Sequence, residues 1–274
     1  KQLPTYRIRG RVAEFPDEYA VRLGLIEGDA VDVDYQPWPG LFDYQRDIAA
    51  MAVRKRKFAV FADCGLGKTL IFLEFVRHAL KSIPKNRCAL MVSPLMVVPQ
   101  TIAECRKWYG DALPIEQVRS ADLNDWLASG NGRLGITNYE ALKTEVEPGR
   151  LGALVLDESS LLKSHYGKFG TECIRLGRGL DWKLAGTGTP APNDRIEYGN
   201  HAVLLDEFPN VNAFLARFFI NRGQTCERWE IKPHAIGPFY RALSHWCLFL
   251  NNPATYGWKD NVASMPPIHV HIHD

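Results

Sequence analysis

Residues 62–69 read ADCGLGKT and follow an apolar stretch at 58–61. An apolar strand that runs into a glycine-rich turn, with Lys-Thr opening a helix, is typical of a phosphate-binding loop. Glycines let backbone N–H groups close around phosphate oxygens, and the helix start adds the positive end of its dipole. We therefore expect Lys68 to reach the β- and γ-phosphates of a nucleoside triphosphate and the Thr69 hydroxyl to bind Mg²⁺.

A second stretch, LVLDE at residues 154–158, is apolar and ends in two carboxylates. It predicts a buried strand that carries Asp157 to the metal ion and Glu158 to the attacking water. Each stretch alone has an ordinary structural alternative, because strand-to-helix turns and acidic strand ends are common. Ala62 also stands where the usual loop pattern begins with glycine. Together the two stretches predict that the chain binds a nucleoside triphosphate and hydrolyses it.

The composition is that of an ordinary globular protein, and 274 residues suffice for one large α/β domain with a small appendage. A formal net charge of +2 excludes a globally basic protein, so any nucleic-acid surface must be local. Six cysteines without a C-x-x-C pair favour reduced thiols in a cytoplasmic protein over a disulfide frame or a zinc site. No apolar run reaches the length of a membrane span.

Residues 1–40 differ from the rest of the chain. The segments 6–9 and 30–35 alternate apolar and polar residues, as half-buried strands do, and Pro39-Gly40 ends this part. We expect a small β-containing appendage over residues 1–40 and one larger domain over residues 41–274.

From Leu41 onward, predicted strands alternate with predicted helices. The strands are expected at 58–62, 89–93, 134–137, 153–157 and 182–187, with helices such as 69–80 and 98–108 between them. This alternation predicts a mostly parallel sheet covered on both faces, with ligands at the carboxyl ends of its strands. After Asn193 the alternation stops, and apolar spacing from Ile236 to Leu250 is that of an amphipathic helix. We expect residues 195–250 to form a helical subdomain.

The phosphate loop and the acidic pair belong to six motifs in a fixed order. The others are Tyr44-Gln45, VSPL at 92–95, ITNYE at 136–140 and GTGTPAPN at 186–193, and the acidic motif extends to LDESS at 156–160. This series resembles the first RecA-like lobe of superfamily-two helicases, and is most similar to Swi/Snf-type DNA translocases and the helicase-like proteins of bacteriophages. The resemblance covers about residues 41–274. It implies a RecA-like P-loop domain with a helical insertion after the Gly-Thr-Pro motif.

The resemblance also implies roles for individual residues. Gln45 would hydrogen-bond the adenine edge of ATP, although a helix-surface glutamine is the alternative from the residue alone. Asp157 would share Mg²⁺ with Thr69, and Thr187 and Thr189 would couple the state of the γ-phosphate to the nucleic-acid track. The segment that would hold the triphosphate consists of Gly65, Leu66, Gly67, Lys68, Thr69 and Leu70.

Two further segments align with loops that contact one strand of a nucleic acid in this family. Their residues are Ser93, Pro94, Asn138 and Tyr139. Ordinary turn chemistry is the alternative for Ser93-Pro94. For the basic run at 54–57 we favour a solvated turn over phosphate contacts.

The chain departs from the family pattern in three ways. Ser159-Ser160 replaces the usual Ala-His or Ala-Asp after the acidic pair, and Phe42 stands where Swi/Snf proteins carry arginine. The arginine-bearing second lobe is not part of this sequence, and we expect residues 265–274 to lead toward it. His269, His271 and His273 alternate in this end segment, where a solvated strand is favoured over a metal site.

The resemblance therefore implies the first lobe of a double-stranded DNA translocase that hydrolyses Mg²⁺-bound ATP, in the cytoplasm, or in that of the host if a bacteriophage carries it. We expect the isolated lobe to bind ATP weakly and to hydrolyse it poorly. Three alternatives stay open: a strand-separating DNA or RNA helicase, a DNA-binding scaffold whose motor remnant no longer cycles, and a phosphate-loop kinase of small substrates.

Overall fold

A computed structural model describes residues 35–131, 133–163, 168–191, 193–223 and 228–259, and two short strands before them. These strands, β1 (Arg7–Arg9) and β2 (Val12–Glu14), pair antiparallel. β1 falls in the segment 6–9 that was predicted to be a strand. Most of the predicted appendage over residues 1–40, and the whole of the end segment 265–274, lie outside the described residues.

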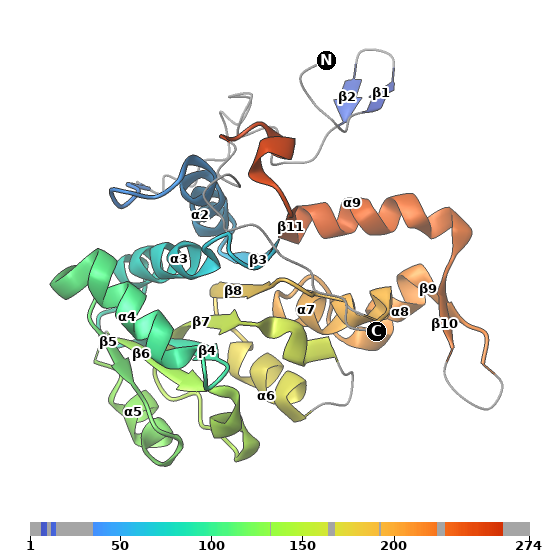
Figure 1. The fold of residues 1–274 in the computed structure, drawn as a ribbon. Helices are drawn as coiled ribbons and strands as arrows, with labels where there is room; N and C mark the ends of the chain where they lie inside the picture. The colour runs from blue at the N-terminus through green and yellow to red at the C-terminus, as the bar shows by residue number, and fades with distance from the viewer. Residues whose placement is uncertain are drawn as a thin grey trace, which may run out of the picture.

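The fold is built on a seven-stranded sheet in the order β11-β3-β8-β7-β4-β6-β5, and every neighbouring pair in it is parallel (Figure 1). Its strands are β3 (Lys57–Ala62), β4 (Cys88–Ser93), β5 (Ile115–Gln117), β6 (Leu134–Asn138), β7 (Leu151–Asp157), β8 (Trp182–Thr187) and β11 (Cys247–Leu250). The predicted parallel α/β sheet is thus confirmed.

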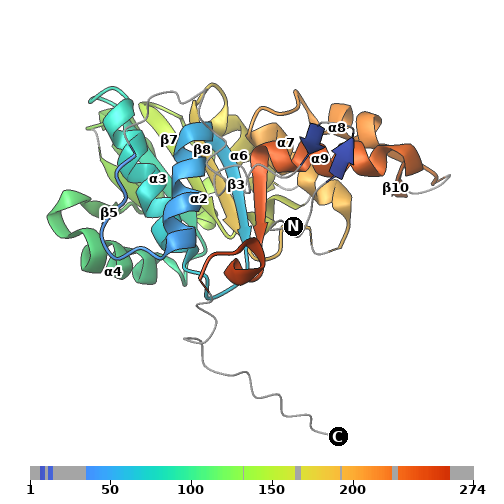
Figure 2. The same cartoon turned by 90° about the horizontal axis from the view of Figure 1, so that it is seen from above.

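Helices cover both faces of the sheet (Figures 1 and 2). On one face pack α2 (Asp43–Lys55), α3 (Lys68–Ser82) and α4 (Val98–Tyr109), and on the other α5 (Leu123–Ser129), α6 (Lys168–Gly177), α7 (Tyr198–Leu204), α8 (Val211–Phe218) and α9 (Ile236–Trp246). Successive strand residues alternate between the two cores, as in β3, where Val60 joins one core and Phe61 the other. Among the described helices, none has both the length and the apolar character that a bilayer span requires.

The segment after the Gly-Thr-Pro motif is only partly helical, so the prediction for residues 195–250 needs correction. The helix α9 ends at Trp246, and Cys247–Leu250 forms the edge strand β11, which pairs with β3 from Cys247↔Ala59 to Leu250↔Ala62. A short apolar run fits a buried strand as well as a helix end, and here pairing with β3 decides between them. The segment also contains the hairpin of β9 (Phe219–Asn221) and β10 (Trp229–Ile231).

The basic run at 54–57 lies at the amino end of β3, opposite the phosphate loop. Lys57 pairs in register with Lys183 of β8, and both ammonium groups bond Asp206, at 2.9 Å and 2.6 Å. Lys55 Nζ donates to the carbonyl oxygen of His245 at 2.6 Å. These side chains therefore serve the packing of the sheet end.

Asp206→Ala should lower the free energy of unfolding by about 2–3 kcal/mol. The substitution would leave the ammonium of Lys183, which is 1% exposed, without its carboxylate partner. Asp206 itself is partly exposed, so the loss should stay below the roughly 3–5 kcal/mol of a fully buried pair. Chemical denaturation checks this. Asp206→Asn is the control, because asparagine tolerates the backbone φ of 63° and keeps one oxygen acceptor, so its loss should be smaller. Equal stability of the alanine variant and the wild type would contradict the prediction.

Candidate active site

The turn between β3 and α3 has the predicted strand–turn–helix geometry. β3 ends at Ala62 and α3 begins at Lys68, and the turn requires a φ of 84° at Gly65 and of 64° at Gly67. Residues other than glycine adopt such angles only with strain. A Cβ atom on Gly67 would also lie 2.3 Å from the side-chain nitrogen of Gln45. The backbone conformation of the loop therefore requires glycine at both positions.

Two side chains of α2 donate hydrogen bonds to backbone carbonyls of this loop. Tyr44 donates its hydroxyl to the Leu66 carbonyl at 3.0 Å, and Gln45 Nε2 donates to the carbonyl of Gly67 at 3.3 Å. Gln45 is buried, and its Oε1 accepts from the backbone N–H of Phe42 at 3.0 Å. Both ends of its amide thus bond the chain's own backbone, and the adenine contact of Gln45 stays a prediction.

Lys68 lies at the start of α3 with its ammonium group folded back on the loop. Its Nζ donates to the carbonyl oxygens of Ala62 at 2.7 Å and Asp63 at 3.3 Å. Both Lys68 and Thr69 are partly exposed, so a ligand at the loop has access to the ammonium and the hydroxyl.

The acidic pair lies at the same edge of the sheet. Asp157 ends β7 in register with Gly186 of β8, and β8 lies between β7 and β3. Because all three strands are parallel, their carboxyl ends bring the phosphate loop, Thr187 and the acidic pair together. Burial raises the pKa of Asp157, while the hydrogen bond from Ser93 and the positive charge of Lys68 act to lower that pKa.

Glu158 is held in an unusual backbone conformation, with a φ of 49°. Such a conformation costs about 1–3 kcal/mol and persists only where the surroundings determine it. Its N–H donates to Asp157 Oδ1 at 2.9 Å, and its carboxylate accepts from the Thr187 hydroxyl at 2.9 Å. The Thr187 oxygen in turn accepts from the N–H of Thr189 at 3.1 Å. Thr189, Thr187 and Glu158 therefore form a chain of two hydrogen bonds, which joins the two threonines predicted to couple the γ-phosphate state to the nucleic-acid track.

Two of the four residues predicted to contact nucleic acid, Ser93 and Tyr139, have buried side chains that bond Asp157. Ser93 Oγ donates to Asp157 Oδ2 at 3.0 Å, and the Tyr139 hydroxyl donates to the Asp157 carbonyl at 2.8 Å. Contact of Ser93 and Tyr139 with nucleic acid stays a prediction. Asn138 and Pro94 are partly exposed, and Asn138 Oδ1 accepts from the N–H of Ala141 at 3.3 Å.

Ser159 has a partner that the sequence analysis missed. Its hydroxyl lies 2.9 Å from Nε2 of His201, a fully buried residue of α7. A histidine followed by apolar residues in the predicted helical subdomain was the only signal in the sequence. Pro192 and the three alternating histidines of the end segment lie outside the described residues.

The residues at this edge fit Mg²⁺. The Thr69 hydroxyl and the Asp157 carboxylate are oxygen donors, and Mg²⁺ in nucleotide sites takes one or two carboxylates together with substrate phosphates and water. Within the described part of the chain, no three His, Cys, Asp or Glu side chains gather into a metal site. A site completed by phosphate oxygens agrees with that donor set.

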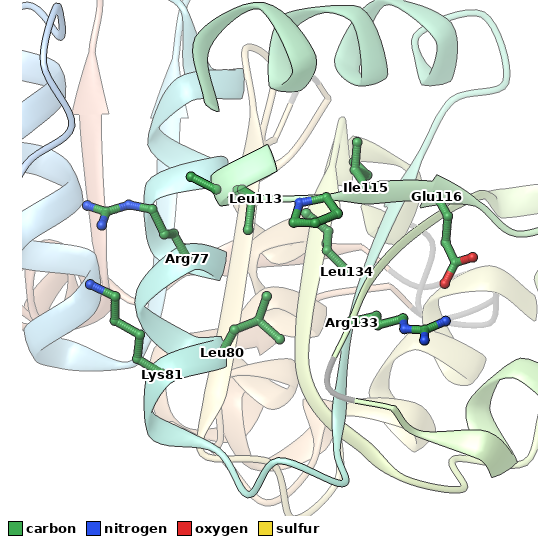
Figure 3. A pocket seen from close by; sticks show the side chains of 10 residues that line it. Arg77, Leu80, Lys81, Leu113, Ile115, Glu116, Arg133 and Leu134 are labelled. Atoms are coloured by element: carbon green, nitrogen blue, oxygen red, sulfur yellow. The ribbon is translucent and has the colours of Figure 1, made fainter. Parts of the chain in front are cut away.

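A hollow of about 320 Å³ adjoins the loop and is lined by Asp63, Gly188, Thr189 and Pro190 among others. A larger cavity of about 490 Å³ lies elsewhere, between the last turns of α3 and the strands β5 and β6 (Figure 3). Its lining includes Lys81, which is about 20 Å along the helix from Lys68. This larger cavity contains none of the predicted site residues.

Comparisons with known proteins agree with this arrangement. The model of the SNF2-related domain family matches residues 48–220, which is more than half of the chain. A search of curated proteins found no significant match.

Solved SWI2/SNF2 ATPase cores share the fold at low sequence identity. The SWI2/SNF2 ATPase core of Sulfolobus solfataricus in complex with double-stranded DNA superposes with a TM-score of 0.61 at 19% identity, over 78% of this chain and 46% of that chain. The SWI2/SNF2 ATPase core domain of the same organism gives a TM-score of 0.63 at 18% identity, over 80% of this chain and 45% of that chain. The UvsW helicase of bacteriophage T4 gives 0.47 at 14% identity, over 59% and 56%. This chain thus spans less than half the length of the two archaeal chains.

Proposed function

The chain belongs to the SNF2-related domain family, and from that membership we propose that it is the ATP-hydrolysing first lobe of a motor that moves along double-stranded DNA. One observation carries the proposal. The phosphate loop after β3, the acidic pair at the end of β7 and Thr187 of β8 meet at one edge of the sheet, and Thr187 bonds Glu158 directly. A helix start facing two carboxylates across one strand is an arrangement that serves triphosphate hydrolysis.

In this proposal water attacks the γ-phosphate of ATP and the products are ADP and phosphate. Lys68 leaves its loop carbonyls to contact the β- and γ-phosphates, and Glu158 accepts a hydrogen bond from the attacking water and orients it. Thr69 and Asp157 hold Mg²⁺, which when bound neutralises charge on the phosphate oxygens. The Thr187 hydroxyl keeps the Glu158 carboxylate in place, so a change at the Gly-Thr-Pro motif reaches the group that orients the water.

Double-stranded DNA is the proposed track. The archaeal core of the same fold was solved with double-stranded DNA, and its chain is more than twice as long as the part that matches here. We propose that a second lobe completes the motor and supplies an arginine to the phosphates, and that closing of the two lobes converts hydrolysis into movement. The partly helical segment after the Gly-Thr-Pro motif supports the translocase over the strand-separating helicase.

The test measures phosphate release by this chain and by the full-length natural protein, without nucleic acid and with duplex DNA, single-stranded DNA or RNA. We expect duplex DNA to stimulate the full-length protein most strongly, and this chain alone to turn over ATP poorly. Displacement of a triplex strand without separation of a duplex is the expected signature of translocation. Duplex separation would support the helicase instead, and absence of nucleotide binding by both proteins would overturn the proposal.

A further inference from the structure

The proposed chemistry leaves one buried polar residue beside the acidic pair without a role. His201 is fully buried in α7, where its ring lies edge-on to Phe61 with centroids 5.2 Å apart. Burial lowers the pKa of His201 to about 4, so the imidazole is neutral near pH 7. Its Nε2 lies 2.9 Å from Ser159 Oγ, and neither side chain is exposed to solvent.

The bond between Ser159 and His201 matters because Ser159 directly follows Glu158. Glu158 holds a strained backbone, and such strain relaxes unless the residues on both sides are fixed. On the near side, Asp157 is fixed by Ser93 and Tyr139. On the far side the chain enters the short helix Ser159–Lys163, whose first residue bonds His201.

The helix α7 holds this far side at a second point. Asn200, next to His201, donates its side-chain amide to the carbonyl of Leu162. Two consecutive residues of α7 therefore bond the first and the fourth residue of the turn that follows Glu158. An apolar residue in place of His201 would fill the space but would leave the Ser159 hydroxyl buried without this partner.

The same helix is tied to the Gly-Thr-Pro motif. Asn193 at the end of that motif donates its side-chain amide to Glu197 Oε1 at 2.8 Å, and Glu197 immediately precedes α7. The motif thus reaches the acidic pair by two routes. One is the direct bond from Thr187 to Glu158, and the other runs through Glu197, His201 and Ser159.

We propose that Ser159 and His201 are a positioning pair, which fixes the backbone of Glu158 and links it through α7 to the Gly-Thr-Pro motif. Neither residue touches the substrate. The inference rests on the proposed ATP hydrolysis and adds to it a specific reason for serine at the position after the acidic pair.

The test uses Ser159→Ala and His201→Leu in the full-length natural protein with saturating duplex DNA. Each variant should lower kcat for ATP about tenfold, because a misplaced Glu158 orients the attacking water poorly. The KM for ATP should change less than about twofold, since the phosphate loop keeps its own contacts. The double variant should be no slower than the slower single variant, because both remove one interaction. Ser159→Thr, which keeps the hydroxyl, should recover most of the rate.

His78→Leu is the matched control. His78 is also a buried histidine, but it lies on α3 with Nδ1 2.9 Å from the Glu74 carbonyl, remote from the acidic pair. The His78→Leu variant should lose thermal stability, while its kcat per folded molecule stays at the wild-type value. Thermal melts and binding of a fluorescent ATP analogue show that each variant is folded. If His201→Leu unfolds the protein, the kcat of Ser159→Ala, which is the smaller change, tests the positioning pair.

The outcomes separate the two proposals. Wild-type protein that hydrolyses ATP, together with Ser159→Ala and His201→Leu variants of unchanged kcat, overturns the positioning pair alone. Additive losses in the double variant, or an equal loss in His78→Leu, overturn it as well. Wild-type protein that binds no ATP and releases no phosphate overturns the proposed function, and with it the positioning pair.

Discussion

Lys68→Ala should abolish DNA-stimulated phosphate release in the full-length protein. Lys68 is the cation at the start of α3, and it lies at the same edge of the sheet as the Asp157 carboxylate. Removing one group that stabilises charge in the transition state lowers kcat by about 10²–10³-fold. ATP affinity should fall too, because in the proposed mechanism the ammonium contacts the phosphates already in the ground state. Single-turnover phosphate release and titration with a fluorescent ATP analogue measure the two effects.

Glu158→Gln should lower phosphate release by a similar factor but leave ATP binding intact. Glutamine has the same shape, and its amide oxygen can still accept from the Thr187 hydroxyl, as the carboxylate does at 2.9 Å. It cannot act as the charged acceptor that orients water.

Two matched controls accompany these substitutions. Lys81→Ala removes an exposed lysine from the far end of the same helix, and Glu147→Gln neutralises an exposed glutamate that precedes the amino end of β7. Both should keep wild-type rates. Unchanged phosphate release in Lys68→Ala or in Glu158→Gln would remove the site assignment.

The long, strongly patterned elements of this fold were predictable from the sequence. β3, β4, β6, β7 and β8 fall within two residues of the predicted strands, because each is a buried apolar run next to a turn. The strands β5 and β11 were missed. Ile115–Gln117 is three residues long, and Cys247–Leu250 continues the apolar spacing of α9 without a break. Only pairing with β6 and β3 shows that these residues are strands.

The candidate site also has residues that the sequence predicts and residues whose contacts it does not predict. Glycine spacing and the two carboxylates locate the loop and the acidic pair, because their chemistry is local in the sequence. The surroundings of Asp157 depend on the strand order β7-β4-β6, which brings Ser93 to it from the end of β4 and Tyr139 from the residue that follows β6. No motif encodes that order, so the bonds of these two residues to Asp157 could not be predicted. The bond of Ser159 to His201 was likewise invisible before α7 was placed.

The buried carboxylate of Glu74, in the middle of α3, should contribute strongly to the stability of the fold. Glu74 is completely buried and accepts hydrogen bonds from Arg77 at 2.8 Å, from the Tyr109 hydroxyl at 3.0 Å and from the Trp38 N–H at 3.1 Å. The Tyr35 hydroxyl donates to it at 3.2 Å. One carboxylate therefore joins α3, α4 and the segment that leads into α2.

Glu74→Gln should lower the free energy of unfolding by about 3–5 kcal/mol at pH 7. The amide turns one oxygen acceptor into a donor that faces other donors, and it leaves the guanidinium of Arg77, whose side chain is only 10% exposed, without a counter-charge. Urea denaturation measures the loss. Glu140→Gln is the control, since Glu140 pairs with Lys143 at the same helical spacing but is more than half exposed. Its loss should stay below about 1 kcal/mol.

The pH dependence gives an independent check on the same carboxylate. Burial alone would raise the pKa of Glu74, but the hydrogen bonds and positive charge of Arg77 outweigh burial and lower that pKa below 4.5. The folded protein therefore binds this proton less tightly than the unfolded chain does. The ionised carboxylate stabilises the fold above pH 4.5, and this contribution is lost as the pH falls through the folded pKa. The wild type should thus lose more stability on acidification than Glu74→Gln, and equal losses in the two proteins would show that Glu74 is not the ionised centre of this cluster.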